Sequence, residues 1–406
     1  MKNSQYKPAA ISLLLGALPV LAQDTCLTEK CCLSDPPHPL RQDAQLRCPP
    51  PIDDDNGPEP VDWSPWTHQP DCVSAERDPK LKYCVYSNSR HGYQGISLIT
   101  KPRTAAESTV MLNEEFPGGH GLNNTIPSYA IIDIPPKGKG VVATRRIRRA
   151  EAFMSDWASV VLDLSFPKAT QQHIGHQFLH LAAEQLSDPG RVLGLGRSST
   201  QAVDIMEDIL GTNSFSYTLG GDSHMALYPE VARINHACRP NAFVRFSPTS
   251  FDVKVVAFRD IEIGEEITIS YIPLNHAREK RQRALRRWGF ECKCSLCTAS
   301  QTEIAASDYR REKIASLQAG IMKAIDELDG TAAVRATYEI LALVEAEDIP
   351  TMVASQYEVL ARLYWKAGDN DTAVQYAQKS LDHLSDLGYI DSRPDDLELL
   401  LKDFTR

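Results

Sequence analysis

The chain has 406 residues, of which 42% are hydrophobic and 24% charged, values typical of a globular protein with two or three domains. Its formal net charge of −10 creates no general attraction for nucleic acid, and we expect no direct binding to it. Two basic clusters, RRIRR at 145–149 and REKRQRALRR at 278–287, are each explained by a solvated face, with a nuclear-localisation signal as the alternative.

The N-terminus has the layout of a secretory signal peptide. Two lysines precede the apolar run AAISLLLGALPVL at 9–21, and Val20 and Ala22 place small residues at a cleavage site. The run is too short to span a bilayer comfortably, so we expect no membrane span. The sequence therefore predicts a signal peptide at 1–22 and a protein that is secreted or in the secretory pathway, with the nucleus or cytoplasm as the alternative.

The region that follows begins with a stretch rich in cysteine, proline and aspartate, which offers few periodic apolar residues. Six of the ten cysteines lie within the first hundred residues, an even number that suits three disulfides in a secreted protein. The sequence does not choose among their possible pairings. These cysteines are Cys26, Cys31, Cys32, Cys48, Cys72 and Cys84.

Strand patterns and helical segments alternate over the middle of the chain. Residues 81–100 and 129–163 show the apolar alternation and the Gly, Pro and Asn turn residues of β-strands. Apolar residues at three- and four-residue spacing predict helices at 171–186 and 200–210, and 251–272 returns to strands. The pattern predicts an α+β fold that is mainly β with a helical insertion.

From Asp308 onward the sequence is helical in character. Residues 357–381 have the spacing of a helix–turn–helix unit with Gly368 in the turn, which resembles one tetratricopeptide repeat. We therefore expect an all-α, tetratricopeptide-like region at 301–406. One apolar stripe predicts packing rather than a ligand site; its members are Ile314, Leu317, Ile321, Ile325 and Leu328.

The four remaining cysteines indicate a metal site. Cys292, Cys294 and Cys297 form the segment CKCSLC, and three thiols cannot all pair off among themselves. Four thiolates are a common ligand set for structural zinc, and Cys238 is the only cysteine left to complete the set. The alternative is a mixture of disulfides and free thiols, because the chain is predicted to enter an oxidising compartment.

His236 and Cys238 lie two residues apart in the segment ARINHACRPNAF, which raises the question of a nucleophilic pair. Such pairs are usually assembled from distant parts of a chain. Alternate residues of a strand share a face without pointing their heteroatoms at each other, so we predict no cysteine hydrolase. Burial as structural polar groups is the alternative role for Asn235 and His236.

The sequence contains six short segments in the order GKGV at 138–141, NSF at 213–215, LYP at 227–229, NHACRPN at 235–241, GEEITISY at 264–271 and FECKCSLC at 290–297. Together they resemble a SET domain with its post-SET zinc segment. NHACRPN and CKCSLC are the most specific of these segments, and the resemblance covers 129–297. In that family a pseudoknot brings the NH segment beside the strand that carries the tyrosine.

The segments NSF and LYP and the helical C-terminus resemble the SET-and-MYND branch of the family. The chain departs from this branch because no cysteine lies between Gly140 and Asn213, so the MYND zinc finger is missing there. The six N-terminal cysteines do not show MYND spacing either, and partner binding through such a finger is not implied. Ala237 stands where the family has serine, which is a mild change.

The resemblance implies transfer of methyl groups from S-adenosylmethionine to lysine side chains of a protein substrate, histone or non-histone. Tyr271 matches the catalytic tyrosine, and Phe290, with Trp288 as a second candidate, matches aromatic residues that cover the adenine. Positions that match cofactor-binding residues are Gly138, Lys139, Gly140, Asn213, Asn235, His236 and Phe290. Positions that match structural zinc ligands are Cys238, Cys292, Cys294 and Cys297.

The domain prediction combines these patterns. It comprises a signal peptide at 1–22, a Cys/Pro-rich, disulfide-linked region at 23–127, a SET domain at 128–273, a post-SET segment at 274–300 and the helical region at 301–406. We expect a monomer whose partner is a protein that presents a lysine. The competing hypothesis is a catalytically inactive, secreted SET-like protein that acts as an interaction module, because S-adenosylmethionine is made in the cytosol.

Overall fold

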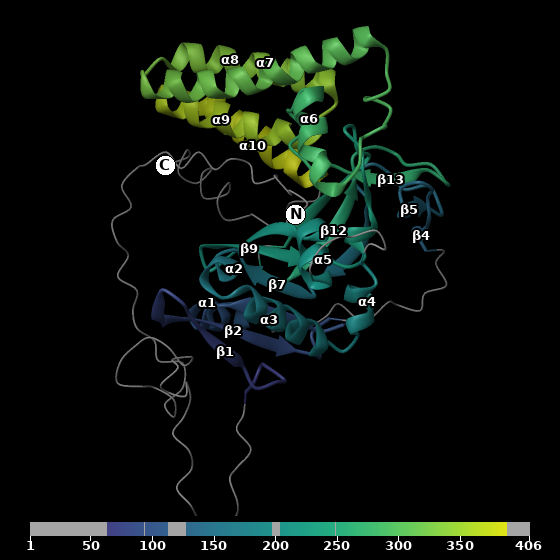
Figure 1. The fold of residues 1–406 in the computed structure, drawn as a ribbon. Helices are drawn as coiled ribbons and strands as arrows, with labels where there is room; N and C mark the ends of the chain where they lie inside the picture. Colours follow the sequence, from purple (N-terminus) through teal and green to yellow (C-terminus); the bar gives the residue numbers. More distant parts are fainter. Residues whose placement is uncertain (1–62, 93, 113–126, 197–203, 248, 388–406) are drawn as a thin grey trace, which may run out of the picture. The chain divides into compact units, whose positions relative to one another are not determined.

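The computed structural model describes residues 63–92, 94–112, 127–196, 204–247 and 249–387 (Figure 1). The predicted signal peptide and the cysteines at 26, 31, 32 and 48 lie outside these residues. The described chain forms two compact units. The first unit holds the described residues up to 112 and those from 157 to 229, and the second holds 127–156 and those from 230 onward.

A six-stranded sheet forms the centre of the first unit, in the order β1-β2-β3-β7-β9-β8. Neighbouring strands pair antiparallel except β3 and β7, which run parallel. All five residues of β3, ISLIT, are buried, as expected of a short apolar run in the interior of a sheet. The strands are β1 (Asp71–Ala75), β2 (Asp78–Asn88), β3 (Ile96–Thr100), β7 (Val160–Asp163), β8 (Phe215–Leu219) and β9 (Asp222–Leu227).

The strand pair predicted at 81–100 is confirmed as β2 and β3. Gly95 lies at the end of the connecting turn with a φ of +81°, and a Cβ at this position would lie 2.9 Å from the Cα of Ser89. Glycine is required both by this backbone conformation and by the close approach. The turn therefore determines where β3 begins.

Helices α1 and α3 pack against β2 and β3. The helix predicted at 171–186 is confirmed as α3. The one predicted at 200–210 is confirmed in part as α5, because 200–203 lie outside the described residues and α5 starts after Asp204. Helix α5 begins at Ile205 because the carboxylate of Asp204 accepts hydrogen bonds from the backbone N–H groups of Met206 and Glu207. The helices are α1 (Pro102–Glu107), η2 (Ser108–Leu112), α2 (Phe166–Ala169), α3 (Gln172–Glu184), α4 (Pro189–Leu193) and α5 (Ile205–Asn213).

A disulfide joins Cys72 of β1 to Cys84 of β2, which lie opposite each other with Cα atoms 4.0 Å apart. The bond closes a short loop with a sequence separation of 12, so loop-closure entropy predicts a stabilisation of about 3 kcal/mol. We expect the Cys72→Ala/Cys84→Ala variant to lose about this much free energy of unfolding, measured by denaturant titration. The parent chain under a reducing agent should show the same loss, and a variant as stable as the oxidised parent would contradict the prediction.

Two small sheets organise the second unit, in the orders β10-β13-β5-β4 and β11-β12-β6. Strand β10 has only two residues and pairs parallel with β13, with Asn235 opposite Thr268 and His236 opposite Ile269. This pairing brings the NHACRPN segment beside the strand that leads to Tyr271. The strands are β4 (Tyr129–Asp133), β5 (Lys139–Ala143), β6 (Ala152–Trp157), β10 (Asn235–His236), β11 (Ala242–Phe246), β12 (Asp252–Ala257) and β13 (Glu266–Ile269).

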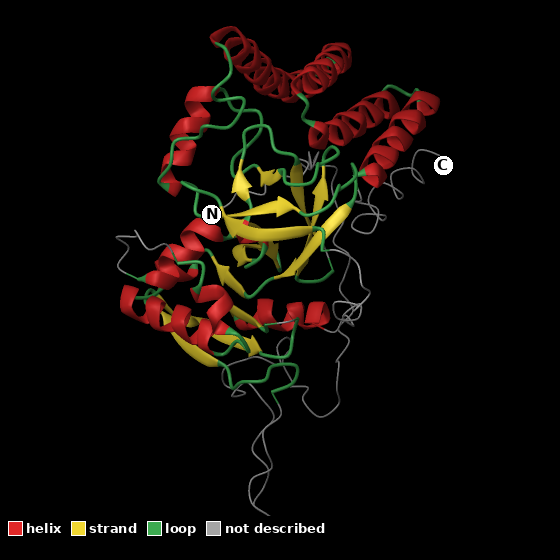
Figure 2. Ribbon diagram, turned by 90° about the vertical axis from the view of Figure 1, so that its right-hand side faces the viewer, coloured by secondary structure: helices red, strands yellow, loops and turns green. Residues whose placement is uncertain are grey.

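The described part of the second unit is mainly helical after residue 277, except for the loop at 289–300 that carries CKCSLC. Helices are drawn in red and loops in green in Figure 2. Ser300 and Glu303 form a capping box at the start of α7, and Asp329 and Asp369 cap α8 and α10. Gly368 has a φ of +83° in the turn between α9 and α10, where the sequence predicted a turn. The helices are α6 (Arg278–Leu285), η4 (Arg286–Trp288), α7 (Gln301–Asp326), α8 (Gly330–Glu347), η5 (Pro350–Met352), α9 (Val353–Lys366) and α10 (Asn370–Asp386), and a short η3 (Val231–Arg233) precedes β10.

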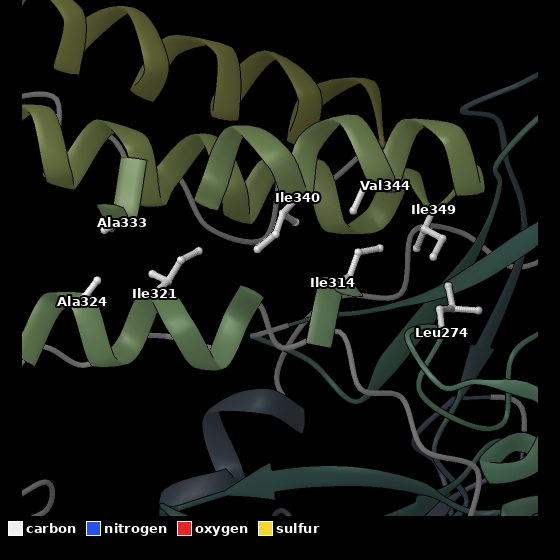
Figure 3. Close-up of a cluster of buried hydrophobic side chains, with 8 residues drawn as sticks. All are labelled: Leu274, Ile314, Ile321, Ala324, Ala333, Ile340, Val344 and Ile349. Carbon is white, nitrogen blue, oxygen red and sulfur yellow. The ribbon is translucent and has the colours of Figure 1, made fainter. Parts of the chain in front are cut away.

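The apolar stripe predicted on α7 faces α8, as Figure 3 shows. Ile314 and Ile321 are buried in one cluster with Ile340 and Val344 of α8. Leu328 is an error in this prediction, because α7 ends at Asp326 and Leu328 is 80% exposed with a φ of +60°. The helical period cannot continue through the turn that leads into α8.

The predicted α+β class is confirmed, with small sheets, a helical insertion between β7 and β8, and an all-helical C-terminal region. None of the described helices is both long and apolar enough to cross a bilayer. The likeness of the C-terminal helices to tetratricopeptide repeats remains a prediction.

Candidate functional site

Tyr271 follows β13 and is buried. Its hydroxyl donates a 2.7 Å hydrogen bond to the carbonyl oxygen of Ile234, the residue before β10. Burial, with a smaller contribution from the negative charge of Glu266, raises the pKa of Tyr271 above its ordinary value. The phenol therefore remains protonated at neutral pH and acts as a hydrogen-bond donor.

His236 connects Tyr271 to the cysteine cluster. Its Nδ1 accepts a 3.1 Å hydrogen bond from the backbone N–H of Tyr271, and its Nε2 lies 3.3 Å from the Sγ of Cys238. Burial lowers the pKa of His236 to about 3, so the imidazole is neutral. Because Nδ1 is an acceptor, we assign the single ring proton to Nε2, where it is donated to the sulfur.

The expectation that His236 and Cys238 point their heteroatoms away from each other is wrong. It assumed a continuous strand, but β10 ends at His236, so the alternation of a strand does not extend to Cys238. The Sγ of Cys238 also lies 3.5 Å from the Sγ of Cys297. The contact is therefore part of a larger cluster and not an isolated nucleophilic pair.

An aromatic cluster surrounds Tyr271. The ring of Tyr271 lies 5.3 Å from that of His236 and 5.4 Å from that of Trp288, centroid to centroid, and Phe290 lies 6.4 Å from His236. Trp288 is 7% exposed and Phe290 is 37% exposed. The residues just before CKCSLC thus supply one aromatic ring beside Tyr271 and another beside His236. Trp288, a second candidate in the sequence, is the one of these two rings that contacts Tyr271.

The glycine turn at the start of β5 lies beside Asn235. The side-chain amide of Asn235 donates to the carbonyl of Lys139 at 3.2 Å and to Glu266 Oε1 at 3.0 Å. A Cβ on Gly140 would lie 2.5 Å from the Cδ1 of Ile134 and 2.7 Å from the Nδ2 of Asn235, so a larger residue would displace these two side chains. Gly138 has a φ of +76°, and a Cβ there would meet no atom within 4 Å, so this turn borders open space.

The side chain of Lys139 points elsewhere, because its ammonium pairs with exposed Asp133 at 2.9 Å. Lys139 therefore presents its backbone to the turn. Asn213 belongs to the first unit, where it ends α5 and donates a 3.1 Å hydrogen bond from its side chain to the carbonyl of Ile209. The cofactor role of Asn213 stays a prediction.

The four cysteines outside the N-terminal set come together. Their sulfur atoms all lie within 4.8 Å of one another, and none of the four is in a disulfide. Cys238, Cys292 and Cys297 are buried, and the backbone N–H of Cys238 lies 3.4 Å from the Sγ of Cys294. Four thiolates in such a cluster could hold one metal ion in tetrahedral coordination.

Arg281 lies buried beside this cluster. Burial alone would lower the pKa of Arg281, but the charges of Cys238, Cys297 and Asp308 raise it above its ordinary value. The sequence treated the whole basic segment at 278–287 as a solvated face, and for Arg281 this is wrong. Its spacing of four residues from buried Leu285 places both on one helix face, which was the signal available in the sequence.

Asn241, the last residue of NHACRPN, is a buried polar residue that ties this segment to β13. Its Oδ1 accepts a 2.8 Å hydrogen bond from the N–H of Thr268, and its Nδ2 donates to the carbonyl of Glu266 at 2.9 Å and to Glu265 Oε1 at 3.1 Å. All of these groups lie on the segment GEEIT. Asn241 therefore holds two of the sequence motifs in register.

Replacing His236 by Asn or Gln separates its two contacts, because Asn retains an acceptor near the Nδ1 position and Gln retains a donor near the Nε2 position. We expect the Asn variant to bind zinc about 10–100-fold more weakly than the parent, since a donor to a ligand sulfur is lost. The Gln variant should retain most of the affinity. Competition with a chromophoric chelator measures both variants, and equal affinities would contradict the Nε2–H···Sγ assignment.

Part of this chain, including the segment from Gly138 to Tyr271, is similar to a known protein family. Residues 138–272, about a third of the chain, match the family model described as SET domain. The chain is 29% identical over 198 residues to the histone-lysine N-methyltransferase set5 of Schizosaccharomyces pombe, a match that covers 46% of this chain and 56% of that protein.

Two human proteins match a shorter part. The identity is 30% over 125 residues with the histone-lysine N-methyltransferase SMYD3 of Homo sapiens, covering 30% of this chain and 27% of that protein. It is 32% over 120 residues with the N-lysine methyltransferase SMYD2 of Homo sapiens, covering 29% of this chain and 27% of that protein. The matches thus span about half the length of the yeast relative and about a quarter of the human ones.

Proposed function

Because residues 138–272 belong to the SET-domain family, we propose that this chain is an S-adenosylmethionine-dependent protein-lysine N-methyltransferase. The observation that supports this most directly is the aromatic cluster in which buried Tyr271 contacts His236 and Trp288. The relatives named above, which are called lysine methyltransferases, support the same reaction class. The substrate protein stays open between histone and non-histone proteins.

The turn of Gly138, Lys139 and Gly140, with Asn235 packed against it, is the proposed place where the cofactor is held. The close approach at Gly140 and the open space at Gly138 support backbone contact with a ligand. His236 would contribute through its backbone, because both ring nitrogens already have partners, and Phe290 through its exposed ring. When bound, S-adenosylmethionine supplies a methyl group that is already activated by its sulfonium. Asn213 completes the proposed set.

Tyr271 is the proposed catalytic residue. A lysine with a reference pKa of about 10.4 must lose a proton before it can attack, and desolvation among aromatic rings favours its neutral form. The protonated phenol of Tyr271 can orient this amine, and correct alignment can contribute roughly 7–11 kcal/mol. No covalent nucleophile on the protein is required.

Cys238, Cys292, Cys294 and Cys297 are the proposed ligands of one structural Zn²⁺. Their clustering as free thiols supports this, and the chemistry of four soft sulfur ligands suits zinc. The ion would fix the CKCSLC segment, and with it Trp288 beside Tyr271 and Phe290 beside His236. It would stabilise structure and take no part in the reaction.

We propose the same domain boundaries that the sequence predicts. The helices from residue 301 onward, tetratricopeptide-like in sequence, would help to form the groove for a protein substrate that presents a lysine. We propose a monomer without direct binding to nucleic acid.

A secreted interaction module without catalytic activity is the second candidate, and the Cys72–Cys84 disulfide favours it because disulfides persist in oxidising compartments. The predicted signal peptide points to the same compartment. Sequencing the mature N-terminus of the expressed protein tests cleavage after Ala22, and an intact Met1 would contradict secretion.

Calorimetric titration of the zinc-loaded protein with S-adenosylmethionine separates the two functions. Saturable binding with one site, followed by transfer of label from the cofactor to lysine in a panel of histones and other proteins, is the result we expect. Absence of binding would remove the enzyme and favour the interaction module.

A further inference from the structure

Helix α7 reaches the candidate site through one fully buried arginine. The Nη2 of Arg311 donates a 3.1 Å hydrogen bond to the carbonyl of Cys238, and its Nη1 donates to the carbonyl of Leu274. Cys238 is a proposed zinc ligand, and Leu274 lies three residues after Tyr271. One side chain from the C-terminal helices thus binds the backbone next to the zinc-ligand candidate Cys238 and the backbone that follows Tyr271.

Glu347, at the end of α8, holds Arg311 in this orientation. The Nε of Arg311 lies 2.8 Å from Glu347 Oε1, and both side chains are 0% exposed. Glu347 also accepts hydrogen bonds from Ser307 and from Arg310, the latter at 2.7 Å. Burial alone would raise the pKa of Glu347, but the hydrogen bond from Ser307 and the charge and hydrogen bonds of the two arginines lower it, so the carboxylate is charged.

Leu274, three residues after Tyr271, is also held by apolar contacts of its side chain. The side chain of Leu274 is buried in the cluster of α7 and α8 with Ile314 and Ile349 (Figure 3). Both the backbone and the side chain of Leu274 are therefore fixed by the C-terminal helices. A change in the packing of α7 against α8 would be transmitted to the chain beside Tyr271.

A buried ion pair is a costly way to achieve stability alone. Apolar residues of similar volume are often as stable, whereas removal of one partner leaves an uncompensated buried charge. Arg311 differs from an apolar residue in one useful respect, because its guanidinium offers several donors in a fixed plane and can bind two carbonyls and a carboxylate at once.

We propose that Arg311 is a positioning residue through which the C-terminal helices set the geometry of the zinc ligand Cys238 and of the segment after Tyr271. The expected effect on catalysis rests on the proposed function, whereas the expected effect on zinc binding does not depend on methyl transfer. It makes the helical region part of the site and not a separate module.

Four variants test this. Arg311→Met leaves the carboxylate of Glu347 as a buried charge without its main partner. Arg311→Lys keeps a positive charge opposite Glu347 but has one nitrogen in place of the three that bind Glu347 and the two carbonyls, so it does not reproduce their spacing. The double variant Arg311→Met/Glu347→Leu removes both buried charges and with them the destabilising effect of an unpaired one. Lys313→Met/Glu339→Leu is the matched control, because it removes an ion pair of 3.3 Å between the same two helices that is exposed to solvent.

Each variant is measured for its denaturant midpoint, for zinc affinity by chelator competition, and for kcat and KM in methyl transfer. We expect the lysine variant to remain folded but to bind zinc about 10–100-fold more weakly, as for other groups that orient metal ligands. The double variant should recover a midpoint above that of Arg311→Met alone while its zinc affinity and kcat stay low. The control should match the parent in all three.

Zinc affinity equal to that of the parent in Arg311→Lys, or in a folded double variant, would overturn the proposal and leave Arg311 a purely structural residue. A parent that binds zinc but transfers no methyl group would remove the proposed function, and the zinc measurements would still decide the role of Arg311.

Discussion

Cys238→Ser is expected to lose stoichiometric zinc and, with it, methyl transfer. The Sγ of Cys238 lies 3.5 Å from that of Cys297 and 3.9 Å from that of Cys292, so this side chain is the link between NHACRPN and CKCSLC. Structural zinc sites contribute about 10–16 kcal/mol of binding free energy at neutral pH, and a serine hydroxyl is a poor substitute for a thiolate. The loss should therefore exceed that of any single hydrogen bond in the site.

Metal analysis of the purified protein measures this directly, with one zinc per chain expected in the parent and much less in the variant. Limited proteolysis should also cut the segment around Phe290 faster, because its connection to Cys238 is lost. Ser295→Ala is the matched control, since Ser295 is exposed within CKCSLC and offers no sulfur. A Cys238→Ser protein that retains one tightly bound zinc would contradict the four-thiolate site.

Tyr271→Phe is expected to reduce kcat by about 100-fold or more while leaving the affinity for S-adenosylmethionine close to that of the parent. The hydroxyl is the only polar group that this change removes, and small errors of alignment at a reacting centre can cost about 100-fold. The carbonyl of Ile234 loses its 2.7 Å donor, so unfolding free energy should also fall by about 1–3 kcal/mol.

The pH profile distinguishes orientation from proton transfer. Because burial raises the pKa of Tyr271, the phenol does not ionise at neutral pH, and the rate should rise with pH only as the substrate amine loses its proton. Tyr271→Phe should keep this rising limb at a lower rate. Tyr129→Phe is the control, because it removes a phenolic hydrogen bond to Glu230 in the same unit but outside the aromatic cluster. Disappearance of the rising limb in Tyr271→Phe would show that the tyrosine itself is the titrating group.

The motifs of the site could be predicted because each depends on local sequence. The glycines at 138 and 140 reflect the backbone conformation of a turn. The alternation of EITI reflects the two-residue period of a strand, and the spacing of the thiols in CKCSLC reflects the geometry of metal ligands. Neighbouring residues determine each of these features. The same holds for the helices after residue 300, whose caps and apolar period are local signals.

The contacts that join these motifs could not be predicted, because they depend on where strands end and on which distant helix packs against them. The side chain of His236 contacts Cys238 because β10 ends at His236, and the hydrophobic pattern of the sequence does not show where this strand ends. Arg311 and Glu347 look like ordinary surface charges of amphipathic helices, and only the packing of α7 and α8 makes them buried.

The distribution of sulfur between the two units has a consequence for the order in which the protein matures. Cys72 and Cys84 are joined in the first unit, whereas the four clustered cysteines of the second unit remain thiols. Neighbouring thiols that meet an oxidant before they meet a metal can form disulfides with one another, whereas thiols bound to an ion are protected. A chain with both arrangements therefore needs a metal ion to reach the four cysteines of the second unit before an oxidant does.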